Sequence, residues 1–141
     1  MTMLSELPPL SQMIPGAPFH HDIGIRYADH GKNWISLELP YDPALDGYGE
    51  PGVVSGGAVF TLMDASSGMS VMVTRNALAP MATLDLRLDY LRPANAGETI
   101  RSRVECYRLT RRFGFTRGIA YNNDPNHPIA HASGIFIISG A

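Results

Sequence analysis

The groups with the clearest capacity for chemistry lie in one ten-residue stretch, residues 55–64. Ser55 precedes a long apolar run, which is typical of a helix N-cap, and Gly56 and Gly57 open the first turn. The first amides of a helix lack intrahelical acceptors and lie at the positive end of its dipole, so they can hold a negative charge. Because glycine has no Cβ, a ligand can approach this backbone closely. The helix start is therefore a candidate site for a negatively charged group.

Asp64 is the only charged residue between Ser55 and Thr74. A lone carboxylate on an apolar helix is a candidate general base or nucleophile. It could equally be a structural carboxylate that pairs with an arginine or caps a loop. The glycine pair likewise has a structural interpretation, close packing of the helix on a strand, and Ser55 could serve as an N-cap alone.

The spacing between Gly56 and Asp64 has a consequence for assembly. Eight residues of helix correspond to about 12 Å of rise. One aspartate side chain cannot span that gap, so the two residues of one chain cannot act on the same group. A two-fold dimer can bring Asp64 of one subunit opposite Gly56 of the other. The sequence therefore predicts a homodimer with two shared sites.

The elements that must position these residues are two strands, one long helix and four more strands. Leu84, Leu86, Leu88 and Tyr90 alternate with polar residues that include Thr83, which is the period of a strand. The helix is apolar on nearly every side, which predicts that it is buried. An antiparallel sheet wrapped around this helix would bury both, an α+β fold. The expected helix covers residues 55–75 and the expected strands 23–27, 34–39, 81–91, 98–109, 113–121 and 129–138.

Length and composition limit the alternatives. The chain has 141 residues, with four prolines in residues 1–18. We expect an N-terminal extension over 1–18, in which any helix is short, and a single domain over 19–141. Only 17% of the residues are charged, so part of the surface is expected to be buried in an oligomer. A net charge of −2 and a pI of about 6.2 argue against nucleic-acid binding.

Compartment and metal content are predicted from what the sequence lacks. The single cysteine, Cys106, cannot form an internal disulfide and is typical of a reducing compartment. Residues 53–74 are interrupted by Asp64, serines and glycines, so no membrane span is expected. The start of the chain has no signal-peptide pattern, and we expect a cytoplasmic protein. The five histidines show no metal-ligand spacing, so no metal is expected.

Two stretches resemble the hotdog-fold acyl-CoA thioesterases, most closely the phenylacetyl-CoA-type branch. The first is Ser-Gly-Gly followed by six residues and Asp64, where that branch typically has His-Gly-Gly, six variable residues and Asp. The second, residues 82–94, looks like the third strand of the family and the turn after it. The resemblance covers roughly residues 20–138 and implies the hotdog fold and a homodimer with shared sites. We expect the homodimer to associate further as a dimer of dimers, and the choice between dimer and tetramer stays open.

The resemblance also implies roles for individual residues. The backbone N–H of Gly56 would polarise a thioester carbonyl, with Gly57 beside it, and Asp64 would act as nucleophile or as general base for water. Thr83 falls where a serine or threonine helps to position that water. Ser55 stands where the family usually has histidine. The substrate would be an acyl-CoA, and no cofactor is needed beyond the coenzyme A that belongs to that substrate.

Three arginines on connecting loops are candidates for binding coenzyme A. Arg92 follows the strand over 81–91, and Arg111 and Arg112 lie in the next hairpin turn. Coenzyme A carries several phosphates, which suit guanidinium groups. These residues could also be solvated turn charges. The sequence thus predicts a phosphate-binding mouth near the turns.

Two other functions stay open on the same fold. A non-catalytic acyl-CoA-binding protein is one, because fold does not fix function and the usual histidine is absent. An acyl-thioester hydratase or dehydratase is the other, although such enzymes typically pair a histidine with an acidic residue, and this helix has no histidine.

Overall fold

The structure is a computed structural model that describes residues 18–139. Most of the predicted N-terminal extension, residues 1–17, therefore lies outside the described residues. No helix of the described part is both long and apolar enough to cross a membrane. The elements are α2 Pro18–Ile23, β1 Arg26–His30, β2 Trp34–Leu39, η2 Pro43–Leu45, α3 Gly56–Arg75, β3 Met81–Tyr90, β4 Ile100–Leu109, β5 Phe113–Tyr121 and β6 Ala130–Ile138.

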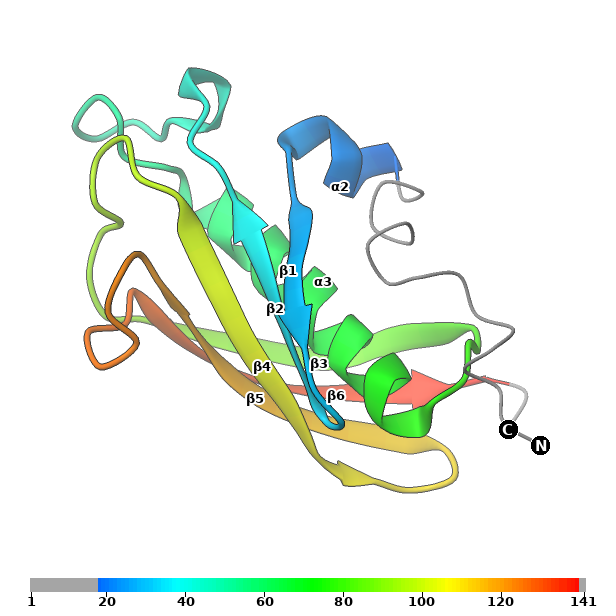
Figure 1. Ribbon diagram of the computed structural model, residues 1–141. Helices are drawn as coiled ribbons and strands as arrows, with labels where there is room; N and C mark the ends of the chain where they lie inside the picture. Colours follow the sequence, from blue (N-terminus) through cyan, green and yellow to red (C-terminus); the bar gives the residue numbers. More distant parts are fainter. Residues whose placement is uncertain (1–17, 140–141) are drawn as a thin grey trace.

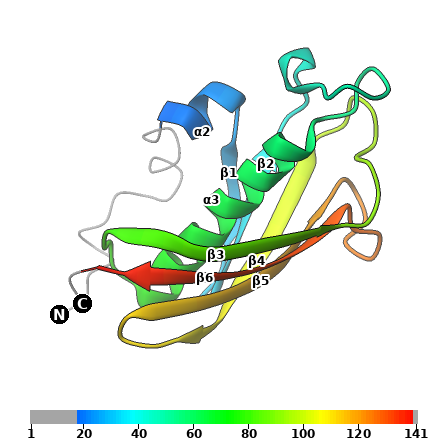
Figure 2. The ribbon, with the colours of Figure 1, turned by 180° about the vertical axis from the view of Figure 1, so that it is seen from behind.

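The six strands form one antiparallel sheet in the order β1-β2-β4-β5-β6-β3. The sheet curves around α3, which packs mainly against β4, β2 and β5 (Figure 1 and Figure 2). Inward side chains of the strands and the buried side of α3 form the main core. The predicted order of two strands, one helix and four strands is confirmed, and so is the α+β class.

The first predicted strand is wrong at its start. Ile23 and Ile25 both pack toward the core, which imitates the alternation of a strand. Ile23 instead ends the short helix α2, and Gly24 follows at φ +90°, a conformation that favours glycine. Strand β1 then begins at Arg26. Two isoleucines that pack toward the core two positions apart therefore look like part of a strand in the sequence, although one ends a helix and the other precedes the strand.

Helix α3 has the ends that the sequence predicts. Ser55 is the N-cap, and its Oγ accepts a hydrogen bond from the Ala58 amide at 3.3 Å. Asn76 is the C-cap, in the left-handed conformation at φ 61°. Half of the 20 helical residues are buried. The prediction of a fully buried helix is therefore not met within one chain, where Phe60 is 39% exposed.

The uncovered side of α3 lies beside β3, an edge strand of ten residues. No strand within residues 18–139 pairs with the outer edge of β3. Leu84 and Tyr90 on this strand are 59% and 51% exposed. Long edge strands with exposed apolar side chains are ready to pair with another strand. The open side of α3 and the edge of β3 therefore form one unpartnered surface.

A buried hydroxyl pair joins α3 to the sheet on its covered side. Ser66 Oγ donates to the Leu62 carbonyl at 2.7 Å and lies 2.6 Å from Ser102 Oγ on β4. Ser102 Oγ in turn accepts from the Leu37 amide at 3.0 Å, inside the β2–β4 ladder. The Ser102 hydroxyl thus serves as the acceptor for the buried Leu37 amide, at a point where β2 and β4 show no residue pair in their register.

Replacement of Ser102 by alanine should lower the free energy of unfolding by about 1–3 kcal/mol, because the Leu37 amide would be buried without an acceptor. Urea denaturation followed by circular dichroism measures the change. Ser36→Ala, on the same strand as Leu37 but only half-buried, is the control and should change stability by less than about 0.5 kcal/mol. Equal effects of the two substitutions would contradict this account.

Candidate active site

The first turn of α3 presents two amides without acceptors. The Ala58 amide bonds Ser55 Oγ, and the Val59 amide bonds the Ser55 carbonyl at 3.3 Å. Within residues 18–139, neither the Gly56 nor the Gly57 amide has an acceptor, and both residues are exposed. The Ser55 cap therefore satisfies the inner amides and leaves the two glycine amides for an external acceptor.

The loop before α3 is tied down by one carboxylate. Asp46 accepts hydrogen bonds from the Tyr41 hydroxyl at 3.0 Å and from the Gly52 amide at 3.1 Å. The Ser55 amide bonds the Leu45 carbonyl at 2.8 Å. These bonds fix the approach of the chain to the helix start. Sequence reasoning did not single out Asp46, whose signal is only its place in a loop rich in glycine and proline.

An open groove of about 370 Å³ adjoins the glycine amides. Apolar side chains form most of its lining, and Gly56, Tyr90 and Arg92 add polar groups. Such a groove suits an elongated, mainly apolar ligand whose polar atom reaches the helix start. The lining residues are Val53, Val54, Gly56, Val59, Tyr90, Leu91, Arg92, Pro93, Ala94 and Ile129.

Asp64 and Thr83 meet on the uncovered side of α3. Thr83 Oγ1 donates a hydrogen bond to Asp64 Oδ1 at 2.9 Å. Asp64 is half-buried, Thr83 is exposed at the sheet edge, and Asp64 Oδ2 has no partner in the described part of the chain. The carboxylate is thus oriented by one donor and keeps one oxygen for a water molecule or a substrate.

A bulge in β3 turns Thr83 toward Asp64. Thr83 pairs with Phe136 and Asp85 with Ile135, so Leu84 is an extra residue in this strand. Phe136 is buried on the helix side, and Thr83 opposite it faces the same way. The uninterrupted alternation that the sequence predicted for this strand is therefore wrong at Leu84, because a bulge reverses the faces on one side of it.

Gly56 and Asp64 lie at different places along the open surface. The Tyr90 hydroxyl bonds the Gly56 carbonyl at 2.7 Å, whereas Asp64 bonds Thr83, seven residues earlier on β3. With about 12 Å of helix rise between them, Gly56 and Asp64 of one chain do not converge. One chain therefore holds the two halves of the predicted site, the Gly56 half and the Asp64–Thr83 half, at separate places on its surface.

The predicted arginine cluster does not form within one chain. Arg92 uses its Nη atoms to bond the Pro93 and His127 carbonyls and Asn95 Oδ1, at 2.8–3.2 Å. Arg111 and Arg112 lie in the β4–β5 turn, at the end of the sheet where β3 begins. Because neighbouring strands are antiparallel from β4 through β5 and β6 to β3, β3 runs opposite to β4, so the segment after β3 and the turn after β4 lie at opposite ends of the sheet.

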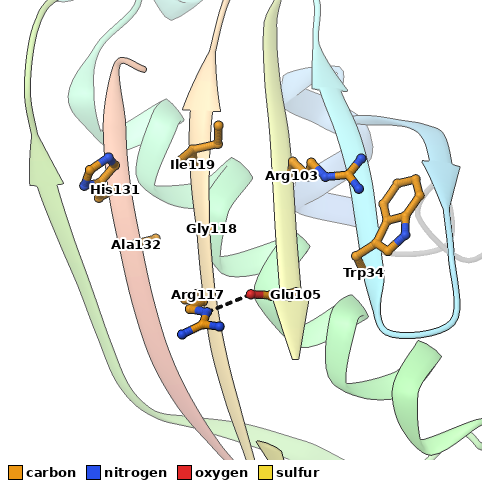
Figure 3. A pocket seen from close by; sticks show the side chains of 8 residues that line it. All are labelled: Trp34, Arg103, Glu105, Arg117, Gly118, Ile119, His131 and Ala132. Carbon is orange, nitrogen blue, oxygen red and sulfur yellow. Dashed lines mark hydrogen bonds and ion pairs between the residues drawn. The ribbon is translucent and has the colours of Figure 1, made fainter. Parts of the chain in front are cut away.

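A second hollow, of about 500 Å³, lies on the sheet face turned away from α3 (Figure 3). Its charged groups are already engaged: Arg117 Nε lies 2.7 Å from Glu105 Oε1, and the Arg103 guanidinium stacks 3.9 Å from the Trp34 ring centre. Its lining residues lie on β2, β4, β5 and β6, which are paired on both sides, so it has no counterpart to the glycine amides beside the smaller groove. Volume alone therefore does not identify the candidate active site. The smaller groove is the better candidate because it adjoins backbone amides that lack acceptors.

No group of three or more His, Cys, Asp or Glu side chains within residues 18–139 could hold a metal ion. Among the titratable groups near the groove, burial raises the pKa of the Tyr90 phenol above its ordinary value. This phenol is therefore protonated at neutral pH and acts as a hydrogen-bond donor.

Comparisons with known proteins identify relatives of this chain by sequence and by fold. The family model described as the thioesterase superfamily matches residues 51–129. The Escherichia coli protein named medium/long-chain acyl-CoA thioesterase YigI is 23% identical over 134 residues, covering 86% of this chain and 85% of that protein. A Halobacterium salinarum protein named "Putative esterase" is 35% identical over 75 residues, and this match spans only half of that protein.

Solved structures share the whole fold. A crystal structure of a Pseudomonas aeruginosa protein has 38% identity and a TM-score of 0.80, covering 92% of this chain and 98% of that one. Zebrafish thioesterase superfamily member 2 has 19% identity and a TM-score of 0.80, covering 99% of both chains. The sheet order, the wrapped helix and the family match lead to one conclusion: this chain belongs to the thioesterase superfamily and has its hotdog fold.

Proposed function

We propose that this chain is an acyl-CoA thioesterase, which hydrolyses a thioester to a carboxylic acid and free coenzyme A. The observation that carries the proposal is the pair of half-sites on one open surface: free glycine amides beside an apolar groove, and the Asp64–Thr83 pair. The superfamily match and the E. coli relative, named for medium- and long-chain acyl-CoA, support it.

The two halves supply complementary chemistry. When an oxygen nucleophile adds to the thioester carbon, negative charge develops on the carbonyl oxygen, and the Gly56 and Gly57 amides stabilise it. Asp64 either removes a proton from the attacking water or attacks the carbon itself. Thr83 orients the carboxylate or the water. The tetrahedral intermediate then collapses, the carbon–sulfur bond breaks, and the coenzyme A thiolate leaves and takes up a proton. If water is the nucleophile, the carboxylic acid forms directly; if Asp64 is the nucleophile, water then hydrolyses the mixed anhydride, which releases the acid and restores the carboxylate.

A two-fold dimer through β3 would join the halves. Antiparallel pairing of two β3 strands about an axis through Arg87 pairs Leu86 with Leu88 of the second copy and, because Leu84 is the extra residue of the bulge, places Thr83 opposite Tyr90 of the second copy. Since Thr83 holds Asp64 and Tyr90 holds Gly56, Asp64 of one subunit then approaches Gly56 of the other. The exposed, ten-residue edge strand supports this pairing.

The same dimer would assemble a phosphate-binding region. The pairing places the start of β3 of one subunit opposite Arg92 of the other, and the Arg111–Arg112 turn lies at that end of the sheet. Arg92 has no carboxylate partner within residues 18–139, so its charge is not neutralised. Arginines from two subunits would then attract the phosphates of coenzyme A.

Loss of either half of the site should lower turnover by about 10²-fold or more. Gly56→Pro removes one amide donor, and the first helical position tolerates proline because the preceding Ser55 is already extended, at ψ 150°. Asp64→Asn removes the charge but keeps an acceptor for Thr83. We expect kcat to fall about 10²–10³-fold for the first and about 10²–10⁴-fold for the second. The assay is thiol release from a panel of aliphatic and aryl acyl-CoAs.

Asp29→Asn, an exposed carboxylate on β1, is the control and should retain wild-type turnover. Full activity in Asp64→Asn would exclude the assigned role of Asp64. A folded wild-type protein that binds acyl-CoA but releases no thiol from any member of the panel would favour the non-catalytic binding protein. Water addition to an enoyl thioester would favour a hydratase.

Shared sites predict complementation between inactive chains. Asp64→Asn and Gly56→Pro chains, co-expressed with different tags and purified through both, form a heterodimer in which one of the two sites has both groups intact. About half of the wild-type activity per dimer should return, while each homodimer stays inactive. A heterodimer no more active than either homodimer would show that each site is built within one chain.

A further inference from the structure

Tyr90 ends β3 and contacts the first turn of α3. Its hydroxyl donates to the Gly56 carbonyl oxygen at 2.7 Å, across 34 positions of sequence. An alanine Cβ built at Gly56 would lie 3.6 Å from the Tyr90 ring, so ring and backbone are in van der Waals contact range. Sequence reasoning took Tyr90 only as one member of an alternating strand, and nothing in that alternation distinguishes it from the leucines.

This bond acts on the peptide unit that most needs support. Two glycines in succession open the backbone to a ligand but leave it with the greatest conformational freedom. The Ser55 side chain does not restrain them, because it bonds the Ala58 amide one turn further on. The Gly56 carbonyl and the Gly57 N–H belong to one planar peptide, so a bond that orients the carbonyl also orients that N–H.

The same bond also strengthens the donor. Hydrogen bonds in a chain polarise one another, so a donor on the carbonyl oxygen makes the N–H of that peptide a better donor at its other end. The Gly57 amide has no acceptor within residues 18–139 and is exposed. The Gly56 carbonyl lies in the first turn of α3 and is also held by the helix, so the Tyr90 hydroxyl adds a second restraint on the direction of the Gly57 amide and increases its strength as a donor.

We propose that Tyr90 is a positioning residue for the hydrolysis of thioesters, which orients the Gly56–Gly57 peptide so that the Gly57 amide joins the Gly56 amide as a second donor to the thioester oxygen. This inference rests on the proposed function. Tyr90 acts through the backbone of Gly56 and takes no part in proton transfer or bond formation.

The test is Tyr90→Phe, which keeps the ring and removes the hydroxyl. Loss of a complete oxyanion donor costs about 10²–10³-fold in kcat, and misorientation of one donor should cost part of that, about 10-fold, with KM changed less than about 2-fold. Two coenzyme A derivatives separate positioning from general damage. A trifluoromethyl ketone, which forms a tetrahedral oxyanion, should bind about 10-fold more weakly to the variant. An S-alkyl thioether, which has no carbonyl oxygen, should bind unchanged.

The control is Tyr27→Phe, which removes a hydroxyl whose contact with His30 Nδ1 is also 2.7 Å long, on the opposite edge of the sheet. It should leave both affinities and kcat unchanged. Equal weakening of the ketone and the thioether in Tyr90→Phe would indicate a merely structural role, and unchanged kcat and ketone affinity would overturn the proposal.

A readout without turnover separates this proposal from the proposed function. With glycine labelled at its carbonyl carbon, the ¹³C resonance of Gly56 should shift in Tyr90→Phe and stay in place in Tyr27→Phe. If the wild type hydrolyses no thioester but the resonance shifts and the ketone affinity still depends on Tyr90, the function fails and the positioning role stands. An unmoved resonance overturns the role whatever the activity.

Discussion

A helix that is apolar on nearly every side must be covered all round, and a six-stranded sheet curves around only part of α3. The side of α3 that the sheet does not cover determines where the other features described here lie. The uncovered side holds the glycine amides, Phe60 and Asp64, and the edge of β3 runs beside it. The surface that the fold leaves uncovered is therefore the surface that carries the candidate site, and under the proposed function activity would require association of two chains.

Much of this arrangement could be predicted because it depends on local rules. Ser55 and Asn76 mark the ends of α3 through capping preferences that act within a few residues. The distance between Gly56 and Asp64 follows from helix geometry alone. The candidate roles of Gly56, Asp64 and Thr83 came from a family resemblance, and the structure adds that Thr83 contacts Asp64.

What could not be predicted depends on contacts between residues far apart in sequence. The partner of Tyr90 lies 34 positions away, and the acceptors of Arg92 include a carbonyl 35 positions away. The periodicity of apolar residues along the sequence gives no information about hydrogen bonds between residues so far apart. The predicted start of β1 was wrong for a different reason. Ile23 and Ile25 show the same alternation of apolar residues whether or not Gly24 turns the chain between them.

The bulge at Leu84 makes the candidate site depend on the pairing register of β3 as well as on residue type. One extra residue in β3 decides whether the Thr83 hydroxyl faces Asp64 or the opposite side of the sheet. If Leu84 paired with Phe136 instead, Thr83 would turn to the opposite face and lose Asp64, although every polar group of the site stays in the sequence. A descendant of this chain would therefore lose the Asp64–Thr83 contact by a one-residue shift in strand pairing alone, without any substitution at either residue.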